Sequence, residues 1–87
     1  MSVAERFTAA QAKAKAFKKA PTNDQLLDLY ALFKQGTGGD STGTRPGMFD
    51  LVGRAKFDAW TKLKGTSKDA AMESYCALVD KLALTCG

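Results

Sequence analysis

Hydrophobic residues recur along the chain with the period of an α-helix, in four separate stretches. These run from Val3 to about Phe17, from Asn23 to Gln35 or slightly beyond, from Asp50 to about Lys64, and from Ser67 to about Leu84. Within each, apolar side chains return every three or four residues, and none shows the strict alternation expected of a β-strand. The pattern predicts an all-α protein of four helices.

Residues that start or stop helices stand between these stretches. Pro21 ends the first helix, and Thr22 with Gln25 has the spacing of a capping box that opens the second. Asp50 and Ser67 are suitable N-caps for the third and fourth helices. We therefore expect short connections between the first two helices and between the last two.

The segment from Gly36 to Gly47 is the one long connection, rich in glycine and other turn-forming residues. Short connections favour antiparallel neighbours for the first helix with the second and the third with the fourth, whereas a long crossover allows the second and third to run parallel. We expect a single domain spanning residues 1–87, a four-helix bundle with up, down, down, up connectivity and a long loop between the second and third helices.

One face of the second helix carries both apolar and charged side chains. At about 100° per residue, five residues fall within an arc of about 120°: Leu26, Leu27, Tyr30, Phe33 and Lys34. Lys34 lies one turn beyond Tyr30, so its ammonium could stand above a ring and an apolar floor. Lys56 and Trp60 repeat the pattern in reverse order on the third helix. Such a face could bind a molecule that is anionic at one end and apolar at the other. It could also be core with a lysine stem along it, the commoner case for this pattern alone.

Composition limits the kinds of partner and site that the protein can have. The formal charge of +4 favours an anionic partner, whether nucleic acid, a membrane surface or a phosphorylated small molecule. Because no apolar run suits a membrane span or a secretion signal, we expect a soluble cytoplasmic protein. Cys76 and Cys86 would lie about 15 Å apart on one helix, too far for a disulfide. The chain has no histidine, so we expect neither a metal site nor catalytic residues.

The middle of the chain is less generic than its ends. Its distinctive segments are Tyr30-Ala31-Leu32-Phe33-Lys34-Gln35, Gly39-Asp40, Arg45-Pro46-Gly47-Met48, Asp50, Arg54 to Trp60 and Leu63 to Ser67, with Phe7, Pro21 and Tyr75 at matching places. In order and spacing they closely resemble the acyl-CoA-binding protein family. The resemblance implies the same four-helix fold and non-covalent binding, buffering and transport of medium- to long-chain fatty acyl-CoA esters, without enzymatic activity and without a cofactor. It favours a binding site over a core surface as the interpretation of the face from Leu26 to Lys34.

The resemblance also implies which residues contact the ligand. These are Lys15, Tyr30, Ala31, Leu32, Phe33, Lys34, Lys56 and Tyr75. Lys34 and Lys56, with the Tyr30 hydroxyl, would hold the ribose 3′-phosphate. Lys15 would approach the other phosphates, and aromatic rings near Phe33 would pack on adenine.

Apolar positions would accept the acyl chain. By the same resemblance the acyl groove is lined by Phe7, Leu26 and Leu27, and Tyr75 contacts the ligand near its pantetheine.

Three positions depart from the commoner pattern of the family. Phe33 stands where tyrosine is frequent, Val52 where lysine is frequent, and Phe57 in place of the first tryptophan of a pair. We expect these changes to alter affinity and chain-length preference more than the activity itself.

Two other functions fit parts of the sequence. A basic helical module could bind nucleic acid or an anionic membrane through the lysines between Lys13 and Lys19, and the stripe from Leu26 to Phe33 could receive a partner helix. The resemblance favours instead a monomer that binds acyl-CoA esters and no nucleic acid, with transient contacts to acyl-CoA-using enzymes and membranes.

Overall fold

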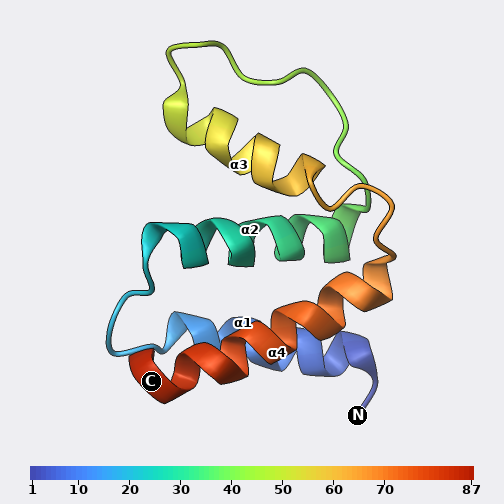
Figure 1. The fold of residues 1–87 in the computed structure, drawn as a ribbon. Coiled ribbons are helices and arrows are strands. Elements are labelled where there is room, and N and C mark those ends of the chain that lie inside the picture. The colour runs from blue at the N-terminus through green and yellow to red at the C-terminus, as the bar shows by residue number, and fades with distance from the viewer.

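The computed structural model describes residues 1–87 and contains four helices and no strand: α1 (Val3–Lys15), α2 (Asn23–Gly38), α3 (Leu51–Thr61) and α4 (Lys68–Cys86). Figure 1 shows α1 and α4 running in one direction and α2 and α3 in the other. The predicted all-α class and the up, down, down, up connectivity are therefore confirmed. None of the helices is both long and apolar enough to cross a membrane.

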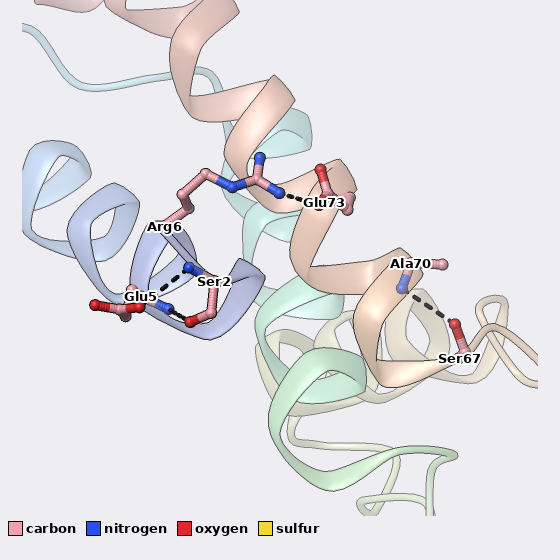
Figure 2. Close-up of polar contacts among 6 residues, drawn as sticks. All are labelled: Ser2, Glu5, Arg6, Ser67, Ala70 and Glu73. Atoms are coloured by element: carbon pink, nitrogen blue, oxygen red, sulfur yellow. Dashed lines mark hydrogen bonds and ion pairs between the residues drawn. The ribbon is translucent and has the colours of Figure 1, made fainter.

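Each helix begins at a residue whose side chain caps it. Thr22 Oγ1 accepts a hydrogen bond from the Gln25 N–H at 3.2 Å, and Gln25 Oε1 accepts one from the Thr22 N–H at 2.8 Å. The predicted capping box is thus present. A second box opens α1 at Ser2, and both it and the cap of α4 at Ser67 are drawn in Figure 2. Asp50 caps α3 as predicted.

The C-terminal ends of the helices differ from the prediction. α1 and α3 end earlier, at Lys15 and Thr61, because the N–H groups that follow bond to carbonyls three residues back and tighten the last turn. α2 runs to Gly38, within the predicted extension beyond Gln35, and takes in Gly36, which is buried against the Phe7 ring. It ends where Gly39 adopts a φ of 77°. The long loop therefore starts at Gly39 and not at Gly36.

α4 packs against both α1 and α2, whereas α3 packs only against α2. The prediction that a short connection makes packed neighbours of α3 and α4 is therefore wrong, although the two run antiparallel. The antiparallel α1 and α2 meet through side chains, with Phe7 against Gly36 and Phe33, and their backbones do not approach closely. α4 is the longest helix, with 19 residues, and it and α2 each pack against two others. Its buried residues are Ala71, Tyr75, Val79 and Leu82 together with the two unpaired cysteines, Cys76 and Cys86.

Two ion pairs connect α1 to α4. Arg6 pairs with Glu73, as Figure 2 shows, and Lys13 Nζ lies 3.0 Å from Asp80 Oδ1. All four side chains are well exposed, so each pair contributes little to stability. In both pairs the partners are 67 positions apart in the sequence, so the two pairs agree with one alignment of α1 along α4.

Polar side chains fix the long loop to the turn between α3 and α4. The fully buried Gln35 donates from Nε2 to Asp40 Oδ1 at 2.8 Å and to the Thr66 carbonyl at 2.7 Å. The same Asp40 oxygen accepts from the Gly65 N–H at 2.8 Å. These two donors, the Gly65 amide first, hold the pKa of Asp40 below its ordinary value.

Candidate functional site

The exposed face of α2 lies between α1 and α3 and has a hollow on each side. The hollow toward α1 has a volume of about 290 Å³, and the hollow toward α3 about 380 Å³. Leu26 borders both, and its side chain is 45% exposed. Because a single side chain divides them, the two hollows form one trough across α2, which we call the α2 trough.

On the α1 side, the α2 trough has a mostly apolar lining and one cation. The lining consists of Gln11, Ala14, Lys15, Phe17, Pro21, Leu26, Leu29, Phe33 and Tyr75. Lys15 is exposed at the end of α1, and Phe33 is half-buried. Two of the predicted contact residues on separate helices, Lys15 and Phe33, thus lie in one hollow with a third, Tyr75.

Tyr75 joins this hollow to the core beneath it. Its ring is 6% exposed and meets the Phe7 ring edge-on, with centroids 5.0 Å apart and planes at 85°. Phe7 is also 6.0 Å from the Phe33 ring, so it lies below the hollow and supports both rings instead of lining it. Burial raises the pKa of the Tyr75 hydroxyl, and no hydrogen bond within the protein opposes this shift. The hydroxyl is therefore free to bond a ligand in the hollow.

On the α3 side, the α2 trough is lined by Asn23, Leu26, Leu27, Leu51, Val52, Ala55 and Lys56. Leu51 and Val52 form its outer edge, with 74% and 66% of their surface exposed. Lys56 lies one turn further along α3. An apolar chain lying in this hollow would have hydrocarbon on both walls and an ammonium group near one end.

Cations and rings pair crosswise over the seam between α2 and α3. Lys34 Nζ lies 4.9 Å from the centre of the Trp60 ring, and Lys56 Nζ lies 5.2 Å from the centre of the Tyr30 ring. The sequence instead suggested that Lys34 would stand over Tyr30 of its own helix. That expectation is wrong.

The parallel course of the two helices explains why each lysine lies over a ring of the other helix. In α2 the ring precedes the lysine by four residues, and in α3 the lysine precedes the ring by four residues. When two parallel helices lie side by side, each four-residue step spans about 6 Å on both. The ring of each helix therefore meets the lysine of the other, and both cations reach the same seam.

Three lysines at the α2 trough and the adjoining seam have no acidic partner: two line the trough, and Lys34 lies over Trp60 on the seam without lining either hollow. The ion pairs of the protein join Arg6 to Glu73, Lys13 to Asp80 and Arg45 to Asp58. Lys15, Lys34 and Lys56 take part in none of them. Neither hollow of the trough is lined by a carboxylate. The trough therefore carries a net positive field that favours an anionic ligand.

Two predicted contact residues point elsewhere. Ala31 and Leu32 line a third cavity, of about 680 Å³, between α2, α3 and α4, and the structure does not bring them together with the lysines of the trough. Leu27 borders both this cavity and the trough. Asp24 and Asp28 line the third cavity with a single lysine, Lys62, so its lining carries a net negative charge that is unfavourable for an anion. Although larger, it is the poorer candidate for an anionic amphiphile.

Several lining residues were not identified from the sequence as site residues. They are Gln11, Ala14, Phe17, Pro21 and Leu29 on one side and Asn23, Leu51, Val52 and Ala55 on the other. The adjacent apolar pair Leu51 and Val52, directly after the N-cap Asp50, was a usable signal, because a helix that buries one face seldom starts with two exposed apolar residues. The small residues Ala14 and Ala55 have no feature in the sequence that would mark them as lining a site.

The α2 trough offers hydrocarbon, aromatic faces and ammonium groups. No three His, Cys, Asp or Glu side chains come together in the molecule in a way that could hold a metal ion. The arrangement can bind a molecule with a polyanionic head and an apolar tail by contacting both ends at once.

Comparisons with known proteins agree with this chemistry. Residues 4–79 match the sequence model of the family described as "Acyl CoA binding protein". The chain is 57% identical over 76 residues to acyl-CoA-binding protein homolog 1 of Caenorhabditis elegans, covering 87% of this chain and 88% of that one. It is 48% identical over 80 residues to the acyl-CoA-binding protein homolog of Drosophila melanogaster, covering 92% and 93%.

Solved structures give the same result for the fold. The crystal structure of Oryza sativa acyl-CoA-binding protein 2 aligns with a TM-score of 0.89 at 41% identity, covering 93% of this chain and 90% of that one. The crystal structure of the protein named ACBP from Moniliophthora perniciosa aligns with a TM-score of 0.85 at 38% identity, covering 98% and 86%.

Proposed function

The chain belongs to the acyl-CoA-binding protein family, and we propose that it binds medium- to long-chain fatty acyl-CoA esters without covalent chemistry, buffering and carrying them in the cytoplasm as a monomer. The observation that carries this proposal is the α2 trough itself. Its apolar lining is free of carboxylates and includes Lys15 and Lys56, and Lys34 lies over Trp60 on the adjoining seam; none of these three lysines has an acidic partner. An acyl-CoA ester has the matching two ends.

The polar end of the ligand would occupy the seam between α2 and α3. Lys34 and Lys56, with the Tyr30 hydroxyl, would hold the ribose 3′-phosphate, because hydrogen bonds from ammonium to phosphate are about twice as strong as neutral ones. Lys15 would approach the remaining phosphates from α1. Adenine would pack against the Phe33 ring, which keeps its face although it lacks a tyrosine hydroxyl.

The acyl chain would follow the apolar lining past Leu26 and Leu27, and the Tyr75 hydroxyl would meet the ligand near the pantetheine. Burial of a methylene contributes about 0.8 kcal/mol, so ten methylenes contribute up to about 8 kcal/mol before losses from ordering. The tail should therefore supply more of the affinity than the head, and free CoA should bind far more weakly than a long-chain ester.

A carrier needs only to bind, shield and release its ligand. The α2 trough contains neither a carboxylate nor a histidine that could serve as a general base, and its lining holds no cysteine. We propose that the protein is not an enzyme and that acyl-CoA is its ligand, with no resident cofactor. The family assignment does not support nucleic acid, an anionic membrane or a partner helix as the main target.

Isothermal calorimetry with palmitoyl-CoA, free CoA and palmitate tests the proposal. Palmitoyl-CoA should bind most tightly and keep much of its affinity when salt is raised. Binding dominated by contacts to a nucleic-acid backbone would instead fall steeply with salt. Equal affinity for palmitate and palmitoyl-CoA would refute the role of the lysines, and the absence of any response to CoA esters would refute the function.

A further inference from the structure

Four large apolar side chains are exposed together where the long loop enters α3. Their exposed fractions are 67% for Met48, 97% for Phe49, 74% for Leu51 and 66% for Val52. We call this group the apolar corner. Figure 1 shows that the loop reaches α3 at an outer edge of the molecule, away from α1 and α4. A cluster of exposed apolar residues of this kind marks a surface that binds a protein or a membrane.

The apolar corner is continuous with the α2 trough. Leu51 and Val52 belong to the corner and also line the hollow on the α3 side of the trough, together with Lys56. Phe49 and Met48 extend the same apolar surface outward and do not line the hollow. Whatever covers the corner therefore lies directly against the opening through which an apolar chain would enter.

The charges around the corner suit an anionic surface. Arg54 and Lys56 follow in the next turn of α3, and the whole chain carries a formal charge of +4. Asp50 is the one acidic residue between Met48 and Val52. Its Oδ1 accepts the Gly53 N–H at 2.9 Å at the positive end of the helix, where its charge is partly compensated.

We propose that the apolar corner docks onto lipid bilayers with anionic headgroups, so that an acyl-CoA ester passes between the bilayer and the α2 trough without crossing water. Phe49 and Met48 enter the boundary between headgroups and acyl chains, while the exposed Lys56 remains at the phosphates. Asp50 keeps the insertion shallow. The identity of the cargo rests on the proposed function, but the docking concerns the protein without ligand.

The size of the corner favours a bilayer over a protein partner. A specific protein interface involves about 20 to 30 residues on each side. Four side chains at an outer edge, followed at once by charged residues, fall well short of that. Shallow insertion into a membrane needs only a few such side chains beside cations.

Binding to vesicles of phosphatidylcholine and phosphatidylserine in a 4:1 ratio tests the docking. Energy transfer from Trp60 to a dansyl lipid reports the bound fraction for the wild type, Phe49→Ser and Leu84→Ser. Leu84 is the matched control, because its side chain is 87% exposed but lies near the end of α4. Phe49→Ser should lower the partition constant about tenfold or more, and Leu84→Ser should leave it within about twofold.

Three results would overturn the docking proposal. The wild type could fail to bind these vesicles, or Phe49→Ser could bind them as well as the wild type does. The wild type could also self-associate in a manner that Phe49→Ser abolishes, without binding vesicles, which would assign the corner to a second copy of the chain.

A transfer experiment separates this proposal from the proposed function. Wild-type protein should take dodecanoyl-CoA from vesicles at a rate that rises with vesicle concentration, and Phe49→Ser should lose most of that dependence. The affinity of Phe49→Ser for dodecanoyl-CoA in free solution should equal that of the wild type. A wild type that binds vesicles but no dodecanoyl-CoA would refute the function and leave the docking standing. Equal transfer rates for the two proteins would refute the docking route.

Discussion

The ammonium group of Lys56 on α3 lies 5.2 Å from the centre of the Tyr30 ring on α2. The reciprocal pair, Lys34 with Trp60, lies 4.9 Å apart along the same seam. Each helix thus supplies the cation for a ring of the other. Because the indole N–H of Trp60 also donates to the Gly39 carbonyl at 2.8 Å, this ring has a fixed orientation beside its lysine. Before any ligand binds, one of these cations, Lys56, thus lines the apolar trough, and the other, Lys34, lies on the adjoining seam.

Removing one of these cations should weaken binding without unfolding the protein. Lys56→Ala should lower the affinity for palmitoyl-CoA by about tenfold or more, because a hydrogen bond to a charged group contributes about 1.5 to 3 kcal/mol. The loss of an exposed cation–π contact costs only about 0.5 to 1 kcal/mol of stability. Calorimetric titration and thermal melting followed by circular dichroism measure the two effects separately.

Lys62→Ala is the matched control for Lys56→Ala. Lys62 directly follows α3 but lines the third cavity and not the α2 trough. It should leave the affinity for palmitoyl-CoA nearly unchanged. If the two variants lose affinity equally, net charge is responsible and the position of Lys56 is not. If Lys56→Ala unfolds, its role is structural.

The starts of the helices were predictable from the sequence because capping depends on residues close in the chain. Thr22 and Gln25 meet through local geometry alone. The choice of packing neighbours was not predictable in this way, since it depends on how α4 covers two apolar faces at once.

The same difference between local and long-range geometry decides which features of the candidate site could be predicted. Its lysines and aromatic residues were recognisable, but the pairing of Lys56 with Tyr30 follows from the parallel alignment of α2 and α3, which no single helix encodes.

The end of α2 also depends on residues of other helices and could not be predicted from local sequence. Glycine usually stops a helix, and that led to a loop being expected from Gly36. In the folded protein a Cβ at this position would lie 3.2 Å from Met72 Cγ and 3.3 Å from Phe7 Cζ. Close packing with other helices therefore favours a glycine within the helix, and the sequence around Gly36 does not reveal those neighbours.

Two glycine substitutions in the same turn of α2 should change stability in opposite directions. Gly36→Ala should destabilise the protein, because overpacking typically costs about 1 to 3 kcal/mol and exceeds the gain in helix propensity of about 1 kcal/mol. Gly38→Ala, where a Cβ meets nothing within 4 Å, should stabilise it by about 0.4 to 1 kcal/mol. Urea unfolding measures both, and stabilisation by Gly36→Ala would show that Met72 and Phe7 yield readily.

The stabilising effect of Asp40 should depend on pH. Hydrogen bonds from the Gly65 amide and Gln35 hold the pKa of Asp40 below its ordinary value of 3.8. The carboxylate therefore contributes stability above about pH 5, and this contribution is lost as the pH falls through the folded-state pKa.

Asp40→Asn keeps an oxygen acceptor but removes the charge, so the variant isolates the titration. Its urea midpoint should lie below that of the wild type at pH 6, and the gap should narrow at pH 3. A gap of constant size at both values would attribute the effect to geometry and not to charge.

The position of the bound ligand tests the central claim most directly, because the molecule offers two apolar sites along α2, the α2 trough and the third cavity. The measurement is an amide NMR titration of nitrogen-labelled protein with palmitoyl-CoA. Binding in the α2 trough and along the seam predicts the largest shifts at Lys15, Leu26, Val52, Lys56 and Tyr75 of the trough and at Tyr30 and Lys34 of the seam, with Leu63 and Leu78 of the third cavity little affected. Shifts concentrated at Leu63 and Leu78, with Lys34 and Lys56 unchanged, would contradict it.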